Sequence, residues 1–184
     1  MALSMKIQEI VDRNAQIREK LLGSISGLNE AQLNYKSTDT DWSICDIVHH
    51  LALTAEANGK LMSNLLKRAR EENVPPDPSP EGSEIHAADE VFARVAEPKF
   101  QAPDRFVPRS HVPVEESLAR LTASRHTTLE AVEALGSYDL SSLTFPHPFA
   151  GELNGYQWIL MAGGHEHRHG EQINRIKAFP DFPK

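Results

Sequence analysis

Two histidines near the carboxyl end of the chain, His165 and His169, lie four residues apart in the sequence HEHRH. On a helix, this spacing places two imidazoles one turn apart on the same face, where both can bind one metal ion. Since a helix turns by about 100° per residue, both lie within about 20° of Trp158, in the middle of an apolar stripe, and His167 lies on the opposite, polar face. Two stacked core imidazoles each need a partner and cannot both be charged. A shared metal ion meets both needs, and we favour it over two hydrogen-bonded core histidines.

A third ligand is expected from the adjacent pair His49 and His50 in an earlier helix. Relative to the apolar stripe through Ile44, His49 lies about 140° away on the polar face, and His50 lies about 120° away in the other direction, at the edge of the apolar face. The two angles differ little, but the edge position makes His50 the better candidate. We predict that His50, His165 and His169 hold one divalent transition metal, and that His49 and His167 point away from it.

Three neutral imidazoles leave a divalent ion with at least one open coordination position, which is the arrangement of catalytic rather than structural zinc. A water in that position acquires a pKa of about 7, and a thiol in that position is activated. Imidazole suits Zn, Ni, Fe and Cu, so the ligand type alone does not select the ion. Zinc is the first choice, with nickel and iron as alternatives.

Four amphipathic helices are expected to position these residues, because apolar side chains recur every three or four residues along four stretches of the chain. Capping pairs mark two of the helix starts, Ser43 with Asp46 and Asn154 with Gln157. The fold class is therefore all-α. The predicted helices cover residues 5–22, 43–70, 114–136 and 154–176, with a short extra turn near residues 28–33.

A long connection separates the second and third helices. Residues 71–113 contain eight of the twelve prolines, which cannot continue a helix. We predict a proline-rich crossover here, with a short helix near residues 87–95. Four helices with one long connection are typical of a four-helix bundle with a crossover. At 184 residues, the chain has the size of a single domain, which we predict to span residues 1–184.

Charge and composition exclude several classes of function. The net charge of -7 repels nucleic acid and anionic membrane surfaces, so neither is expected as a partner. Cys45 is the single cysteine, which excludes an internal disulfide. The first residues lack an apolar run long enough for a signal peptide or a membrane span, so a cytoplasmic location is expected. The expected partner is a small-molecule substrate, and a homodimer is left open.

Three further residues are candidates for substrate binding. Arg125 lies about 20° from Val114 in the apolar stripe of its helix, where an unpaired charge is costly. It therefore either binds an anionic group of the substrate or forms a salt bridge. His147 precedes the last helix and either overhangs the site or is an ordinary loop residue. Gln172, about 40° from Trp158, either lines the site or supports a ligand.

Two polar residues, Asn14 and Arg18, interrupt the apolar stripe of the first helix. Arg18 either binds an anionic group or has an ordinary structural role, such as a salt bridge, which we favour because long side chains can extend past an apolar face. Glu166 and Glu171 flank the histidines of the last helix. Because Glu171 lies about 140° from Trp158, we do not expect it to be a general base.

Several short motifs together resemble a known family, the DinB-like superfamily of small four-helix metalloproteins. That family includes proteins described as metal-dependent hydrolases and as thiol transferases. In it, a histidine before a leucine on the second helix joins two histidines of the last helix at the metal, and the resemblance implies these roles for His50, His165 and His169. The likeness runs from Trp42 to the end of the last helix. The motifs are the Trp42-Ser43 helix start, the His50-Leu51 pair, and His165-x3-His169 followed by Gln172-Ile173.

Two classes of function follow from these features. The first is a metal-dependent enzyme acting on a small molecule, in which the metal activates water, as in a hydrolase, or a low-molecular-weight thiol, as in a transferase. The second is a non-catalytic metal-binding or dimerisation module. An open coordination position beside a polar cavity favours the enzyme, whereas a fourth protein ligand or a filled pocket favours the module.

Overall fold

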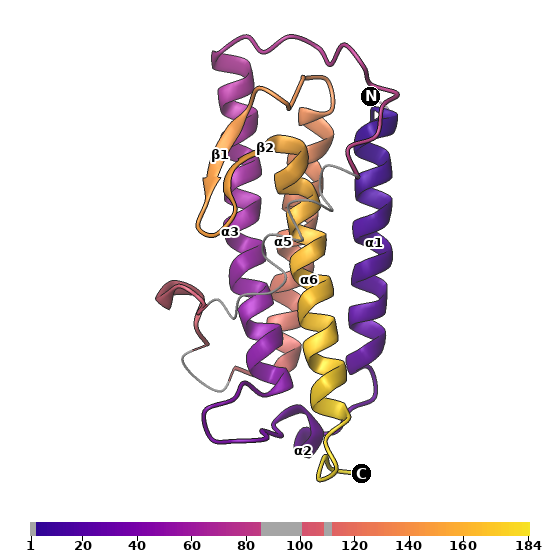
Figure 1. Cartoon of the computed structure of the whole chain (residues 1–184), viewed down its shortest axis with the longest axis vertical. Coiled ribbons are helices and arrows are strands. Elements are labelled where there is room, and N and C mark those ends of the chain that lie inside the picture. Colours follow the sequence, from indigo (N-terminus) through magenta and orange to yellow (C-terminus); the bar gives the residue numbers. More distant parts are fainter. Residues whose placement is uncertain (1–2, 86–100, 109–111) are drawn as a thin grey trace.

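Four long helices lie side by side along one axis in the structure, a computed structural model that describes residues 3–85, 101–108 and 112–184 (Figure 1). The predicted four-helix bundle is confirmed. None of the helices within these ranges is long and apolar enough to cross a membrane. The long helices are α1 (Met5–Ile25), α3 (Ile44–Glu71), α5 (Val114–Leu135) and α6 (Gly155–Lys177), and the short elements are α2 (Glu30–Leu33), η1 (Asp104–Phe106), β1 (Thr144–His147) and β2 (Gly151–Asn154).

Capping boxes start the two helices that carry the candidate metal ligands. At α3, the Ser43 hydroxyl accepts from the backbone N–H of Asp46 at 3.1 Å, and the Asp46 carboxylate accepts from the backbone N–H of Ser43 at 3.0 Å. Asn154 and Gln157 make the same reciprocal pair at α6, at 2.9 Å in both directions. These bonds satisfy N–H groups that have no partner inside the helix. The predicted starts of α3 and α6 are therefore confirmed.

The connection between α3 and α5 must return along the bundle, because these two helices run in the same direction (Figure 1). Its first part is fastened to α1 and α6. The Lys6 ammonium pairs with Asp77 at 3.1 Å and with Glu84 at 3.4 Å, and it lies over the ring of Tyr156. The Tyr156 hydroxyl donates to Asp77 at 2.6 Å. The short helix predicted at residues 87–95 lies outside the described residues.

Most of the apolar core lies in two clusters, one toward each end of the bundle, and a small third cluster of Leu153 and Met161 lies beside the hairpin. One cluster includes Ile7, Ile10, Leu61, Met62, Ala131, Val132, Tyr156 and Leu160. The other includes Leu21, Ile44, Leu51, Ala52, Val114, Leu121, Ile173 and Ile176. Along every long helix, polar or small residues fall between the two clusters. We call these the mid-bundle layer, which includes Asn14, Arg18, Gly59, Ser124, Arg125, Gly163 and Glu166.

A two-stranded antiparallel hairpin, β1 with β2, precedes α6, and the all-α prediction missed it. Its strands have four residues each, and Pro146 in the first weakens any strand signal. Two hydrogen bonds hold the hairpin against the long helices. The Trp158 indole donates to the Phe145 carbonyl at 3.0 Å, and the Arg68 guanidinium donates to the Thr144 carbonyl at 2.8 Å. The hairpin is thereby fixed against α3 and α6.

Gly163 lies where α6 touches α1. A methyl group here would overlap the amide of Asn14, whose nitrogen donates to the Ile159 carbonyl at 2.7 Å. We expect Gly163→Ala to lower the free energy of unfolding by about 1–3 kcal/mol, because overpacking displaces that side chain. Gly170→Ala is the control in the same helix, because its added methyl group would lie at an ordinary contact distance of 3.7 Å from Leu21. Alanine has a higher helix propensity than glycine, so this variant should raise the free energy of unfolding by up to about 1 kcal/mol. Urea unfolding measures the free energy of unfolding of both variants. Equal changes in the two variants would contradict this packing of α1 against α6.

Candidate metal centre

His50 on α3 and His165 and His169 on α6 form one compact group. The Nε2 atoms of His50 and His169 each lie 3.2 Å from the Nε2 atom of His165. Each residue offers one nitrogen, and these three nitrogens all lie within 4.8 Å of one another. Zinc binds imidazole nitrogen at about 2.0–2.1 Å, so two tetrahedral ligand atoms lie about 3.3 Å apart. The three histidines could therefore hold a metal ion.

Hydrogen bonds at Nδ1 turn two of these rings toward the centre. His50 Nδ1 donates to the backbone carbonyl of Phe106 at 2.8 Å, and His169 Nδ1 lies 2.9 Å from the side-chain oxygen of Gln172. A carbonyl oxygen only accepts, so neutral His50 carries its hydrogen on Nδ1 and has a bare lone pair on Nε2. The same tautomer of His169 follows from donation to the Gln172 oxygen. Metal-ligating histidines are held in this way by their second nitrogen.

The third ring, His165, has its Nδ1 atom 3.5 Å from the hydroxyl of Thr54. That hydroxyl donates to the carbonyls of His50 and Leu51, one turn earlier in α3. Its oxygen is therefore left to accept from His165 Nδ1. All three Nε2 lone pairs consequently face one point between α3 and α6.

Burial lowers the pKa of all three histidines. It brings the pKa of His169 to about 3, with the charge of His50 adding to the effect. The pKa of His165 falls well below its ordinary value for the same reason, with further lowering by His169 and His50. Burial also lowers the pKa of His50, and its bond to Phe106 partly offsets this. All three rings are therefore neutral at pH 7, the form in which imidazole binds a metal.

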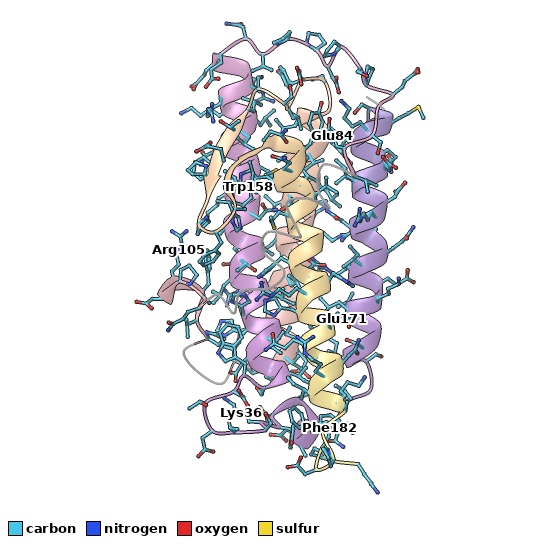
Figure 2. The ribbon with its side chains drawn as sticks, in the orientation of Figure 1. Lys36, Glu84, Arg105, Trp158, Glu171 and Phe182 are labelled. Atoms are coloured by element: carbon cyan, nitrogen blue, oxygen red, sulfur yellow. The ribbon has the colours of Figure 1, made fainter. Side chains whose placement is uncertain are left out.

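The Trp42 ring lies beside the group, and η1 contacts it through the Phe106 carbonyl. The Trp42 ring lies 4.9 Å from the ring of His50 and 6.5 Å from that of His169, measured between centroids. Arg105 of η1 lies on the same flank of the bundle as Trp158, which supports the hairpin (Figure 2). Sequence reasoning missed the Phe106 carbonyl, because no side-chain pattern signals a backbone acceptor.

His49 and His167 are close to the candidate ligands in sequence but do not join the group. His167 is exposed, as predicted. His49 is only 8% exposed, so its predicted place on a polar face is wrong. α5 covers this side of α3, where the Arg120 guanidinium lies 3.5 Å from His49 Nε2 and pairs with Glu56 at 2.8 Å. The helical wheel could not show which neighbouring helix would cover His49.

The three residues predicted to bind substrate have different surroundings. Gln172 contacts His169 and so supports a candidate ligand. His147 lies at the end of β1, where its Nδ1 atom accepts from two backbone N–H groups of the hairpin turn at 3.1 and 3.2 Å. It is close enough to the histidines for its charge to lower the pKa of His165. Arg125 lies in the mid-bundle layer, where burial lowers its pKa.

Arg18 forms a salt bridge, the structural role that we favoured, and does not extend to solvent. Its guanidinium makes two hydrogen bonds to the carboxylate of Glu166, one of them 2.6 Å long, and each residue is 8% exposed. The sequence showed that Arg18 lies on an apolar face but not which acid meets it. Glu166 directly follows the candidate ligand His165, so this ion pair borders the histidine group.

The fold and the site define a four-helix bundle with three clustered histidines on its second and last long helices. Residues 13–173 match the DinB superfamily, and the chain belongs to this family. The resemblance seen in the sequence motifs is thereby confirmed over most of the chain.

The chain is similar to a bacterial protein and to a solved four-helix bundle. The uncharacterized protein YuaE of Bacillus subtilis (strain 168) is 27% identical over 162 residues, which cover 88% of this chain and 93% of that protein. A solved crystal structure of TT2238, a four-helix bundle protein, is 22% identical with a TM-score of 0.62 and covers 92% of this chain and 98% of that chain. The second likeness supports the fold alone.

We expect the metal-free protein to lose stability as the pH falls below about 6.5. The ligand histidines have a lower pKa in the folded than in the unfolded state, so below this pH the unfolded chain binds protons that the folded chain does not. The loss continues toward the folded pKa, about 3 for His169. At pH 5, each histidine that stays neutral in the folded state lowers the free energy of unfolding by about 2 kcal/mol.

We expect His169→Gln to remove the part of this stability loss that comes from His169. His167→Gln, which changes an exposed histidine, should leave the pH dependence unchanged. Denaturant unfolding at pH 7 and pH 5 after chelation measures the difference. The same pH dependence in His169→Gln and in the wild type would contradict a buried, neutral His169.

Proposed function

We propose that this protein is a metal-dependent enzyme acting on a small molecule, with His50, His165 and His169 as the metal ligands. The supporting observation is that the Nε2 atoms of His50 and His169 each lie 3.2 Å from that of His165, with all three nitrogens within 4.8 Å of one another, while each Nδ1 atom has its own contact. Bare lone pairs this close repel one another unless a cation lies between them. Among the residues that the structure describes, no further histidine, cysteine or acid belongs to the group. Three protein ligands and an open position are typical of catalytic zinc.

A divalent ion in this position supplies Lewis acidity and lowers the pKa of a water or of a low-molecular-weight thiol. With water as the nucleophile the enzyme is a hydrolase, and with a thiol it is a transferase. Imidazole ligands alone do not select the ion; zinc is the first choice, with nickel and iron as alternatives.

The surrounding residues orient the ligands, and His147 is a candidate donor to the substrate. The Phe106 carbonyl and the Gln172 side chain fix the rings of His50 and His169, and Trp42 shields these two rings from water. His147 accepts two backbone hydrogen bonds at Nδ1, so its neutral ring carries the hydrogen on Nε2. That N–H group can donate a hydrogen bond to an oxygen of the substrate.

Metal stoichiometry tests the ligand assignment. The purified protein is stripped with a chelator, reloaded with zinc and measured by mass spectrometry. We expect His50→Ala, His165→Ala and His169→Ala each to lose bound zinc, because two imidazoles hold the ion less tightly than three, and His167→Ala to keep it. Gln172→Ala should weaken zinc affinity about 10- to 100-fold, as the loss of a ligand's supporting hydrogen bond does, with exposed Glu171→Ala as the matched control. Loss of zinc in His167→Ala, or its retention in all three ligand variants, would refute the assignment.

Activity should track zinc occupancy if the site is catalytic. Two probes separate the reactions: p-nitrophenyl acetate for ester hydrolysis, and free cysteine with monochlorobimane for thiol conjugation. We expect chelation to abolish turnover of the productive probe while circular dichroism still reports a folded bundle, because the two apolar clusters carry most of the stability. Turnover that survives chelation, or unfolding on chelation, would instead favour a non-catalytic metal-binding module.

A further inference from the structure

His49 has an unpartnered polar atom inside the protein, and its side chain lines a cavity. Its Nε2 atom is 3.5 Å from the guanidinium of Arg120 on α5. A guanidinium only donates, so Nε2 accepts and the ring hydrogen is on Nδ1. That N–H group is buried and has no hydrogen-bond partner among the residues that the structure describes. A buried donor without an acceptor is costly, so an oxygen atom of a ligand would be favourable beside it.

The cavity lies between α3 and η1 and has a volume of about 370 Å³. Small-molecule sites commonly have volumes of about 300–1,000 Å³. His49 and Leu53, one turn apart, line it from α3, and the other lining residues are Arg105 and Val107. His49 is 8% exposed, the two apolar residues are half-buried, and Arg105 is exposed. The cavity therefore has a hydrogen-bond donor at its base, apolar walls and a guanidinium at its mouth.

Arg105 gives this cavity a positive charge. Its guanidinium lies over the ring of Phe106, 4.7 Å from the ring centroid, at the outer edge of the bundle (Figure 2). No acid lines the cavity within the described part of the chain. Arginine pairs with a carboxylate through two parallel N–H groups. The mouth of the cavity therefore suits a carboxylate, and its base suits a neutral oxygen acceptor.

The cavity is separate from the candidate metal centre, because none of the three candidate ligands lines it. His49 and His50 are successive residues of α3, so their side chains leave the helix about 100° apart. His50 meets α6, whereas His49 meets α5. η1 contacts both sites, since the Phe106 carbonyl accepts from His50 and the neighbouring Arg105 lines the cavity. A ligand in the cavity therefore leaves the open coordination position free.

We propose that this cavity binds a small carboxylic acid that has an apolar body and a carbonyl oxygen further along its chain. The carboxylate pairs with Arg105, and the apolar body packs against Leu53 and Val107. The carbonyl oxygen accepts from His49 Nδ1 and so satisfies the buried donor. The proposal goes beyond the proposed enzyme function and needs neither the metal nor turnover.

Three probes that differ by one group test this proposal. β-Benzoylpropionate has both the carboxylate and the carbonyl, γ-phenylbutyrate lacks the carbonyl, and butyrophenone lacks the carboxylate. Isothermal titration calorimetry measures the dissociation constant of each probe for the full-length protein, both zinc-loaded and chelated. We expect β-benzoylpropionate to bind most tightly, and loss of either group to weaken binding about 3- to 10-fold, as loss of one hydrogen bond does. The affinities should be the same with and without zinc.

Variants assign each contact. Arg105→Met should weaken both carboxylate probes but not butyrophenone, and Arg70→Met, which changes an exposed arginine of α3, should weaken none. An asparagine at position 49 places an amide N–H near the position of Nδ1, whereas a glutamine places it near Nε2. We therefore expect His49→Asn to keep the preference for β-benzoylpropionate over γ-phenylbutyrate, and His49→Gln to lose it.

Arg105 is exposed, so its variant and the three probes carry the test even if the His49 variants fail to fold. The proposal is overturned if no probe binds, if γ-phenylbutyrate binds as tightly as β-benzoylpropionate, or if Arg105→Met binds β-benzoylpropionate as the wild type does. Binding that requires zinc would also overturn it, because the carboxylate would then be a metal ligand. A protein that fails to reload zinc but discriminates the probes as expected would refute the proposed metal-dependent enzyme and leave the cavity site standing.

Discussion

The hydrogen bond from His50 Nδ1 to the Phe106 carbonyl joins two parts of the chain that are 56 residues apart. It fixes the hydrogen on Nδ1 and leaves Nε2 free to face the two histidines of α6. The carbonyl belongs to η1, which lies in the connection between α3 and α5 and contacts the group at His50. The long connection thus takes part in building the histidine group as well as joining two parallel helices.

The histidines and the mid-bundle layer place polar groups inside a small bundle, at a cost in stability. The two apolar clusters on either side of the layer offset this cost through packing. The Arg18–Glu166 pair satisfies its own charges, and Asn14 satisfies its amide nitrogen at the carbonyl of Ile159. The three clustered histidines are the polar group of this interior that could hold a metal ion.

Local patterns were enough to predict the four helices, the caps of α3 and α6, and the facing of His165 and His169, because each depends on residues within a few positions of one another. Features set by contacts between distant segments were not predictable. The burial of His49 depends on α5, the acid that meets Arg18 comes from α6, and the Phe106 acceptor is backbone. The hairpin was missed because its strands are short and the first contains a proline.

X-ray absorption at the zinc edge of the reloaded protein tests most directly whether the three histidines form a metal centre with an open position. The predicted spectrum has three imidazole nitrogens at about 2.0–2.1 Å, identified by scattering from the outer ring atoms, and one further light-atom ligand. The spectrum of His50→Ala should show one imidazole fewer. A wild-type spectrum with a fourth protein ligand, or with no imidazole scattering, would contradict an open three-histidine site.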